Sequence, residues 1–430
     1  MPHSSHLKQH PQRVALHNEI HARPPEPMSA PLALTHIVML TDAAAREASR
    51  EHLAQLLRDH HLPPPTEHLT HLRADLGAFR LRWEMHTEFV SYTFIRPLEL
   101  ASVAAQDPPL ALGLVPQDWL AGLPGSCLSA LHLWALPQRI DGAAELKQRL
   151  LFEETLVASR VADGAAEVHT DFAIHADGFS RVLVFTDQLT PRRLGRLMQR
   201  LIEIEGYRMA ALLGLPIARE AMGLLTRGEG ELASLAGAIR TAQRDEEPEL
   251  LDRLTRLAGE VEGQYAATHS RFSASRAYFD LVSRRINDIA ETRLEGMQSI
   301  KDFMERRLSP AMSTCDWAER RQQALSERIS RMSSLLRTRV EIEQQQSSQA
   351  LLASMNQRQD LQLKLQATVE GLSVAAITYY IVGLVSYLAK GAHPLGWPLS
   401  GETTAAIAIP FVALGVWWSI RRMHRKITGH

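Results

Sequence analysis

Two apolar runs near the carboxyl end decide the organisation of this chain: residues 371–389, GLSVAAITYYIVGLVSYLA, and residues 403–420, TTAAIAIPFVALGVWWSI. Each run has close to the ~20 residues that an α-helix needs to cross a hydrocarbon layer of ~30 Å. Neither run contains Asp, Glu, Lys or Arg. The pattern predicts two transmembrane helices, joined by an outer loop at residues 390–402.

The basic tail at residues 421–430 predicts the orientation in the membrane. It carries Arg421, Arg422, Arg425 and Lys426 directly after the second apolar run. Positive charge next to a membrane segment stays on the cytoplasmic side, and two crossings return the chain to the side where it began. We therefore expect a bacterial inner-membrane protein with both termini in the cytoplasm and the lipid bilayer as its first partner.

Composition and charge exclude some classes of protein. The 430 residues, of which 45% are hydrophobic, allow two or three domains. The 47 basic and 48 acidic side chains give a formal net charge of −1, so no overall field attracts nucleic acid. Residues 1–10 lack the apolar core of a cleaved signal peptide. Cys127 and Cys315 are far apart in the sequence, which favours free thiols in a reducing compartment.

Residues 31–189 predict a cytoplasmic α/β or α+β body after an extended segment at residues 1–30. Asp42 is placed to cap a helix at residues 43–60. Strand patterns occur at residues 34–40, 67–73, 78–84, 88–95, 128–136, 155–161, 168–174 and 181–185. A stretch rich in proline and glycine at residues 108–125 predicts a connection between two halves of the body.

From residue 190 onward the sequence predicts helices. Residues 190–313 form a helical region, and residues 314–370 form a stalk helix that can continue into the first membrane segment. Breaks are predicted at residues 214–216, 228–230, 248 and 309–310, where glycine or proline occurs. One packed seam is predicted along the stalk, at Leu325, Ile329, Met332, Leu336 and Val340.

The polar run at residues 341–349 leaves two interpretations open. It is either the lining of a water-filled channel between subunits or a solvated helix face, and the second is the commoner case. The packed seam and the membrane segments favour self-association into a homo-oligomer.

A short motif occurs twice in the body. Residues 84–89, EMHTEF, return as residues 167–172, EVHTDF, which indicates duplicated halves. Side chains alternate along a strand, so the three polar side chains of each copy would share one side. An imidazole between two carboxylates can bind a divalent cation. The candidate metal residues are Glu84, His86 and Glu88 in the first copy and Glu167, His169 and Asp171 in the second. The other interpretation, which we weight more heavily, is the ordinary polar face of two half-buried strands.

A third candidate metal set is His17, Glu19 and His21. These side chains would lie together on a strand, and His17 and His21 would also align on a helix. Glu does not directly follow the first histidine, so the set does not fit the zinc-protease motif. No phosphate-binding loop, dinucleotide fingerprint or nucleophile elbow is found in the sequence. This favours a non-catalytic protein with no identified small-molecule substrate and no cofactor beyond a possible divalent metal.

Three segments carry a family resemblance: HNEIHARPP at residues 17–25, RWEMHTEF at residues 82–89, and YYIVGLVSYLAKG at residues 379–391. With them, the chain resembles a bacterial family of uncharacterised membrane-anchored proteins that contains a domain of unknown function. The resemblance covers nearly the whole chain and implies the same membrane-anchored topology.

The order of the parts also resembles the CorA magnesium-channel superfamily. A cytoplasmic α/β domain is followed by a helical stalk, two membrane helices and a basic tail. The resemblance implies a homopentamer whose first membrane helix lines a pore. The Gly-Met-Asn signature of that superfamily is missing from residues 390–402.

Three functional hypotheses follow. The first is a non-catalytic, membrane-anchored oligomer whose body senses or recruits another molecule. The second is a CorA-like cation channel without the usual filter. The third is a metal-dependent enzyme that uses the candidate metal residues. We rank them in this order because only the membrane anchor has a strong pattern in the sequence.

Overall fold

The computed structural model describes residues 9–14, 16–17, 24–66, 69–99, 103, 108–243, 245–392 and 398–427, except the side chains of residues 423–427. The chain divides into two compact units. The first comprises Met1–Ala242 and Asp252–Met332, and the second comprises Gln243–Leu251 and Ser333–His430. The first unit contains a mixed β-sheet followed by helices, whereas the second consists of helical segments.

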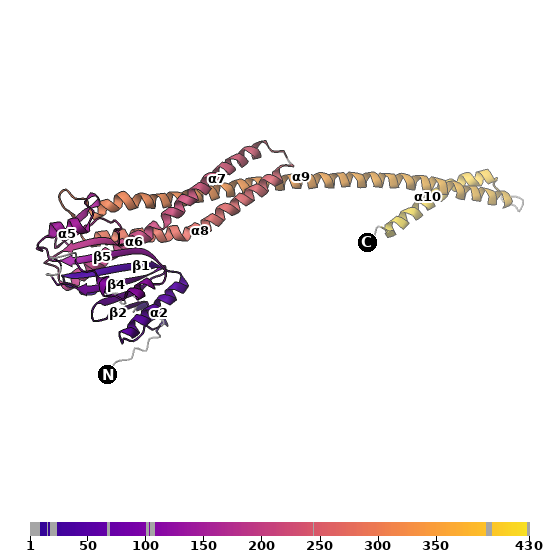
Figure 1. Ribbon diagram of the computed structural model, residues 1–430. Coiled ribbons are helices and arrows are strands. Elements are labelled where there is room, and N and C mark those ends of the chain that lie inside the picture. Colours follow the sequence, from indigo (N-terminus) through magenta and orange to yellow (C-terminus); the bar gives the residue numbers. More distant parts are fainter. Residues whose placement is uncertain are drawn as a thin grey trace. The chain divides into compact units, whose positions relative to one another are not determined.

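The described part of the first unit holds one nine-stranded sheet (Figure 1). Its order is β2-β3-β4-β1-β5-β8-β7-β6-β9. The strands are β1 (Leu32–Leu40), β2 (His71–Asp75), β3 (Arg80–Met85), β4 (Phe89–Pro97), β5 (Ser126–Leu136), β6 (Val157–Val161), β7 (Ala166–Thr170), β8 (Ser180–Phe185) and β9 (Thr292–Arg293). β5 and β8 are parallel, and the other neighbouring pairs are antiparallel.

Helices cover the sheet and continue after it. They are α2 (Ala43–Asp59), α4 (Gln117–Ala121), α5 (Ala143–Leu150), α6 (Pro191–Leu212), α7 (Gly214–Thr241), α8 (Glu247–Asp288), α9 (Ile300–Ala392) and α10 (Gly401–Ile427), with short 3-10 turns η1 (Ala111–Leu114) and η2 (Glu153–Thr155). The predicted start of α2 is confirmed, because the Asp42 carboxylate accepts a hydrogen bond from the amide of Ala45 at 2.7 Å.

The two faces of the sheet have different partners. On one face, α6 packs in a large apolar core with Leu34 of β1, Leu133 of β5 and Val184 of β8. On the other face, α2 packs against β3 and β4 through Trp83 and Tyr92. The α5 helix covers the second half of that face, where Leu146 and Leu150 meet Trp134 and Phe185. Because both faces are covered, the central strands are buried almost throughout.

The eight strands expected from the sequence are all present, with ends shifted by a few residues. The duplication of the two halves is not confirmed. In each half the first strand pairs with the fourth, the fourth with the third and the third with the second. However, β1 and β4 are antiparallel, whereas β5 and β8 are parallel. The two halves therefore share a strand order but not a strand direction.

The helical region differs from the prediction at two of the four expected breaks. The chain leaves the helix between α7 and α8 before Pro248, as expected, and α6 and α7 are separated at the expected place near Gly214, although only by Leu213, whose backbone stays helical. In contrast, α7 continues through Gly228 and Gly230, and α9 continues through Pro310. Packing compensates for the unfavourable residues, since Gly228 lies directly against Leu325 and the residues around Pro310 are in the core. The stalk helix thus begins at Ile300 rather than at residue 314.

The predicted seam along α9 is packed within the chain itself. Leu325, Ile329 and Leu336 are each at most 2% exposed. Beyond residue 340 the side chains of α9 are mostly exposed. The polar run at residues 341–349 is therefore a solvated helix face in the single chain.

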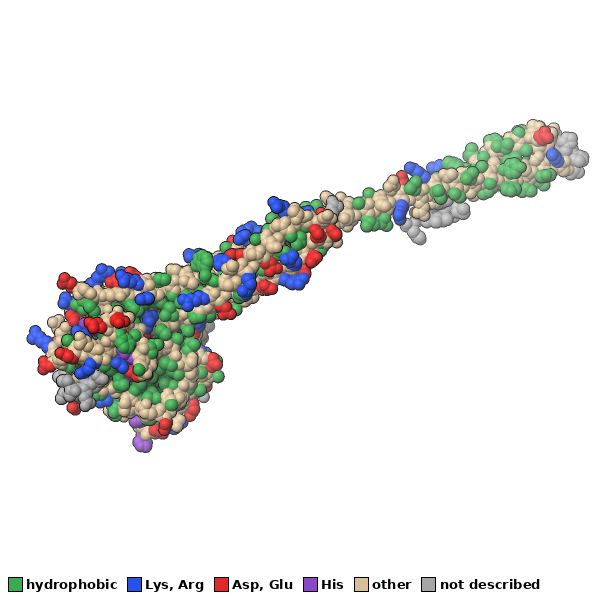
Figure 2. Space-filling view, turned by 45° about the horizontal axis from the view of Figure 1, so that its top comes forward, with side chains coloured by type: hydrophobic (Ala, Val, Ile, Leu, Met, Phe, Trp, Pro, Cys, Tyr) green, Lys and Arg blue, Asp and Glu red, His purple; other side chains and the backbone are tan. Residues whose placement is uncertain are grey.

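Within the described part of the chain, three helical stretches are long and apolar enough to cross a membrane: Pro191–Thr241, Ile300–Ala392 and Gly401–Arg422. In the first, 33% of the apolar window is buried, because α6 and α7 contribute to the core of the first unit. The windows of the other two are 6% and 0% buried. Figure 2 shows apolar side chains gathered over the end of α9 and over α10, in contrast to the charged helices of the first unit.

Candidate functional site

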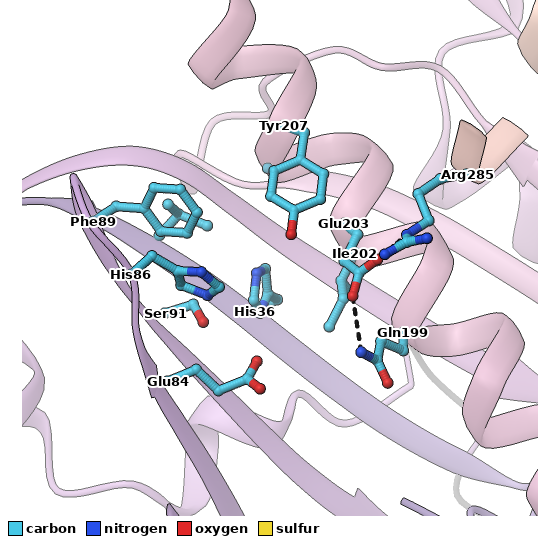
Figure 3. A pocket seen from close by; sticks show the side chains of 12 residues that line it. His36, Glu84, His86, Phe89, Ser91, Gln199, Ile202, Glu203, Tyr207 and Arg285 are labelled. Atoms are coloured by element: carbon cyan, nitrogen blue, oxygen red, sulfur yellow. Dashed lines mark hydrogen bonds and ion pairs between the residues drawn. The ribbon is translucent and has the colours of Figure 1, made fainter. Parts of the chain in front are cut away.

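A polar cavity of ≈ 260 Å³ lies in the first unit between the sheet and α6 (Figure 3). Its walls come from β1, from β3 and the turn that follows it, from β4, from α6, and from one residue of α8. The lining residues are His36, Val38, Glu84, His86, Phe89, Ser91, Gln199, Ile202, Glu203, Gly206, Tyr207 and Arg285. The cavity therefore contains two residues, Glu84 and His86, that the sequence proposed as metal ligands.

The strand register explains how polar side chains meet on this part of the sheet. Ser91 of β4 is the cross-strand partner of both Val38 of β1 and Glu84 of β3. Two residues further along β4, Thr93 pairs in the same way with His36 and Arg82. Alternate residues of a strand share a face of the sheet. The side chains of both sets of cross-strand partners therefore point toward α6.

The opposite wall is one face of α6. The lining residues Gln199, Ile202, Glu203, Gly206 and Tyr207 follow the spacing of a single helical stripe. Figure 3 shows the hydroxyl of Tyr207 pointing into the cavity toward His36. Burial, assisted by the Glu203 carboxylate, raises the pKa of Tyr207 well above its ordinary value. The phenol is therefore protonated and available as a hydrogen-bond donor.

His36 is a buried neutral imidazole on the floor of the cavity. Its Nδ1 lies 2.9 Å from the hydroxyl of Thr93. Burial lowers the pKa of His36 from 6.5 to about 3; the Glu84 carboxylate opposes this shift, and Arg82 and His86 add smaller lowering effects. His36 therefore stays uncharged at physiological pH.

Each carboxylate of the cavity has an arginine partner. Glu84 accepts a hydrogen bond from the buried Arg82 at 2.7 Å. Glu203 is paired with Arg285 of α8, and it also accepts a hydrogen bond from Nε2 of Gln199 at 2.8 Å. Oε1 of Gln199 is buried without a hydrogen-bond partner among the described residues. Arg82 lies outside the lining, so the cavity surface carries two carboxylates and one guanidinium.

Glu88 does not share a strand face with Glu84, which corrects the prediction. β3 ends at Met85 and β4 begins at Phe89, so residues 86–88 form the hairpin turn. The Glu88 carboxylate instead reaches α8, where it pairs with Arg271 and accepts a hydrogen bond from the hydroxyl of Tyr278 at 3.1 Å. This pairing fixes the turn that carries His86, whose ring stacks on Phe89 with centroids 4.4 Å apart.

The second copy of the motif lies on the opposite face of the sheet. On β7, Val168 points into the core beneath α6. Its neighbour His169 instead contacts Phe185 on the α5 side, with ring centroids 5.6 Å apart. Burial lowers the pKa of His169 to about 4. The carboxylate of Glu167 lies 3.7 Å from the His169 ring and 3.4 Å from Arg160.

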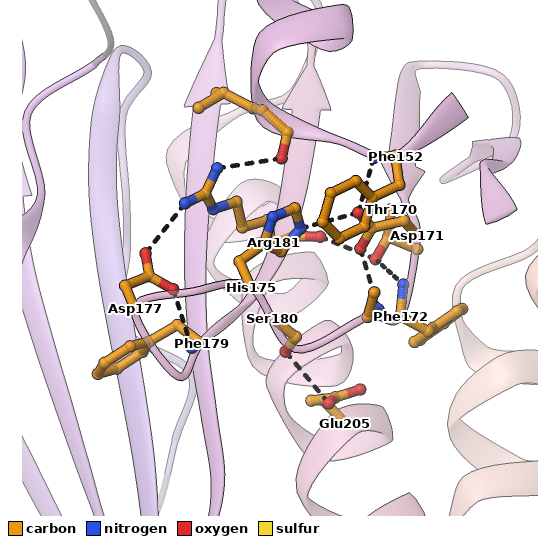
Figure 4. A network of polar contacts seen from close by, with 12 residues as sticks. Phe152, Thr170, Asp171, Phe172, His175, Asp177, Phe179, Ser180, Arg181 and Glu205 are labelled. Carbon is orange, nitrogen blue, oxygen red and sulfur yellow. Dashed lines mark hydrogen bonds and ion pairs between the residues drawn. The ribbon is translucent and has the colours of Figure 1, made fainter. Parts of the chain in front are cut away.

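Asp171 belongs to a separate polar network (Figure 4). Its buried carboxylate lies 2.8 Å from Nε2 of His175 and accepts hydrogen bonds from the amides of Phe152 and Ala173 at 2.9 and 3.0 Å. The ring of His175 stacks on Phe152 at 4.3 Å. These contacts close the loop after β7, so we interpret the network as structural.

The described residues contain no group of three or more His, Cys, Asp or Glu side chains placed to hold a metal ion. Glu84 and His86 lie together, but Glu88 is engaged by α8, and the two motif copies do not converge. His17 is exposed, whereas Glu19 and His21 lie outside the described residues. Metal binding by any of these sets stays a prediction.

Sequence reasoning missed the residues that complete the cavity: His36, Gln199, Glu203, Tyr207 and Arg285. A signal was present for four of them. His36 is a polar residue in the apolar run of β1, and Gln199, Glu203 and Tyr207 recur at four-residue spacing along one side of α6. Arg285 is one of many arginines on α8, and no local pattern distinguishes it.

The fold and the cavity define a protein with an α/β domain that encloses a polar cavity, followed by long helices with exposed apolar stretches. The chain belongs to the DUF3422 family, described as proteins of unknown function, whose model matches residues 8–427. No curated protein and no solved structure matches the chain. The predicted resemblance to an uncharacterised family is therefore confirmed, while the resemblance to the CorA superfamily is not.

Proposed function

We propose that the protein is a non-catalytic, membrane-anchored binding protein. The end of α9 and α10 cross the inner membrane as a hairpin, and the α/β domain binds its ligand on the cytoplasmic side. The observation that carries this proposal is the exposure of large apolar side chains along two uncharged helical stretches. Leu384 and Phe411, for example, are 63% and 75% exposed.

Such exposure is unfavourable in water, where each Å² of apolar surface costs about 25 cal/mol. A bilayer removes this cost and leaves no backbone group unsatisfied, because helices make their own hydrogen bonds. Trp417 and Trp418 stack with Arg421 and Arg422 at 4.8 and 5.2 Å from the ring centroids. Aromatic and basic residues of this kind are typical of the cytoplasmic membrane boundary.

We also propose that α9 associates with a second copy of the chain. Leu351, Leu365 and Leu372 lie at multiples of seven residues, and Met355 and Val369 are fourteen residues apart at the alternate position. All five side chains are exposed. This is the spacing of a coiled-coil seam interrupted by Arg358 and Gln362, and burial of the part outside the membrane run requires a partner helix.

Membrane extraction of the full-length chain tests the anchor. The wild-type protein is expected to stay in the membrane fraction after alkaline carbonate treatment and to leave it only with detergent. The double variant Leu384→Arg with Phe411→Arg should lose this behaviour, because each arginine at the centre of a membrane helix costs about 2.5–3.5 kcal/mol. Leu363→Arg is the matched control, since Leu363 is also 63% exposed but lies outside the apolar runs.

The orientation is tested on the same preparation through Cys127, which is exposed on the α/β domain. A membrane-impermeant maleimide should label it only after the inner membrane is opened. Recovery of the wild-type chain in a detergent-free supernatant would contradict the anchor. Labelling of Cys127 in intact spheroplasts would contradict the cytoplasmic placement.

A further inference from the structure

We propose that the cavity beneath α6 binds a small molecule through a protonated primary amine. This inference rests on the proposed binding function and specifies the chemical class of the ligand. It follows from three features of the cavity: the hydrogen-bond acceptors on its walls, the balance of charge there, and the aromatic rings at one end.

The cavity offers several acceptors to a ligand that donates hydrogen bonds, and the hydroxyls of Ser91 and Tyr207 can either donate or accept. The acceptors on the cavity walls include the carboxylates of Glu84 and Glu203. Oε1 of Gln199 is a buried acceptor without a partner among the described residues. An ammonium group has three donors and no acceptor, so it matches such a set.

His36 adds an independent observation. The imidazole is buried, and its Nδ1 is occupied by the hydroxyl of Thr93. The described residues give Nε2 no hydrogen-bond partner, although the side chain lines the cavity. When Nδ1–H donates to Thr93, Nε2 presents a lone pair to the ligand. A neutral imidazole accepts from a cation without repelling it.

The charge on the walls also favours a cation. Glu84 and Glu203 face the cavity, whereas Arg285 is the one cationic side chain among the described lining residues. Arg285 is already paired with Glu203, and Arg82 approaches Glu84 from outside the lining. The cavity surface therefore has an excess of one negative charge. An anionic ligand would have to displace an existing ion pair.

Aromatic faces complete the site. The rings of Phe89 and Tyr207 lie at one end with centroids 6.5 Å apart, and both line the cavity. Aromatic faces attract alkylammonium groups, with a gain of about 0.5–2 kcal/mol. The volume of ≈ 260 Å³ is slightly below the ~300–1,000 Å³ typical of drug-sized ligands, which limits the occupant to a small amine.

Calorimetric titration of the full-length chain in detergent tests the inference. The probes are ethanolamine, putrescine and histamine, with ethylene glycol as the uncharged counterpart, inorganic phosphate as the anion, and Zn²⁺ and Mg²⁺ as metals. At least one amine should bind the wild-type chain, and neither ethylene glycol nor phosphate should. Glu84→Gln and Glu203→Gln should each weaken amine binding about tenfold or more, because a charge-assisted hydrogen bond is lost.

Two further variants separate the site from general effects on folding. Glu167→Gln alters the equivalent glutamate of the second motif copy, which lies outside the cavity, and should leave amine affinity unchanged. Gly206→Ala places a methyl group on the cavity wall, 3.3 Å from Cγ2 of Val38. It should weaken binding, and the thermal midpoint measured beside the affinity shows that the variant is folded.

Each remaining outcome overturns the inference. These are the absence of binding by every amine to folded wild-type protein, binding of a metal ion but of no amine, and amine binding that neither glutamate substitution weakens. None of them affects the membrane-extraction result, so failure of the amine site is distinguishable from failure of the membrane anchor.

Discussion

Gly195→Ala is expected to destabilise the α/β domain even though it places a better helix former inside a helix. Gly195 lies in the first turns of α6, and a Cβ atom at this position would overlap the carbonyl oxygen of Glu26 and stand 2.9 Å from its carbonyl carbon. The neighbouring backbone is held in place. The amide of Met28 donates to the carbonyl of Pro191 at 2.9 Å, and Glu26 is paired with Arg80.

The magnitude follows from two opposing effects. Overpacking of a rigid contact costs about 1–3 kcal/mol. Replacing glycine by alanine within a helix returns about 0.5–1 kcal/mol. Gly237→Ala in α7 provides the matched control, because a Cβ atom there meets nothing within 4 Å. Gly237→Ala should therefore gain the helix benefit alone, and the two variants should differ by the overpacking cost of about 1–3 kcal/mol.

Thermal unfolding of the full-length chain in detergent, followed by intrinsic tryptophan fluorescence, measures this difference. Trp83 and Trp134 are buried in the α/β domain and report on its packing. At about 2–4 °C per kcal/mol for a domain of this size, Gly195→Ala should melt at least about 2 °C below Gly237→Ala. Equal midpoints, or a higher midpoint for Gly195→Ala, would refute the close approach of residue 26 to α6.

Two other predictions concern stability. Burial lowers the pKa values of His36, His132 and His169 to about 3, 4 and 4. The unfolded chain then binds more protons than the folded chain below pH 6.5, so stability should fall as the pH falls toward 4, by roughly 2 kcal/mol per histidine at pH 5. The same midpoint at pH 7 and pH 5 would contradict this. Gln322→Leu should stabilise the protein by about 1 kcal/mol, because Nε2 of the buried Gln322 has no partner among the described residues and Thr268 keeps its bond to a backbone carbonyl. A lower thermal midpoint than that of the wild type would show that the amide is satisfied.

Local sequence patterns predicted the helices and strands of the fold. They did not predict which strands pair when these are far apart in the sequence. The eight strands and the cap at Asp42 were found because alternation and turn residues are properties of neighbouring positions. The order of the sheet is not such a property, since β1 lies between β4 and β5. β9 was also missed, because it has only two residues and is held by β6, far away in sequence.

The candidate site was predicted in part for the same reason. Glu84 and His86 belong to a local motif and were found. The motif did not show that β3 ends at Met85. It also did not show on which face of β7 each side chain lies. Glu88 was therefore misassigned, and Asp171, which follows the end of β7, was wrongly grouped with His169. Arg285 enters the site only through the docking of α8, which no local pattern specifies.

The second half of the sheet shows that the polar cavity is not required by the fold. There, Leu133 of β5 and Val182 and Val184 of β8 pack in an apolar core with Leu197 and Leu201 of the same helix, α6. In the first half, the sheet positions beneath α6 instead hold the imidazole of His36, the carboxylate of Glu84 and the hydroxyl of Ser91. Burying charged pairs such as that of Arg82 with Glu84 is often less stabilising than burying apolar residues of similar volume. A domain that served only to anchor helices would be at least as stable with an apolar layer on both halves. The polar groups that line the cavity therefore favour the proposed ligand site over a purely structural role for this half of the sheet.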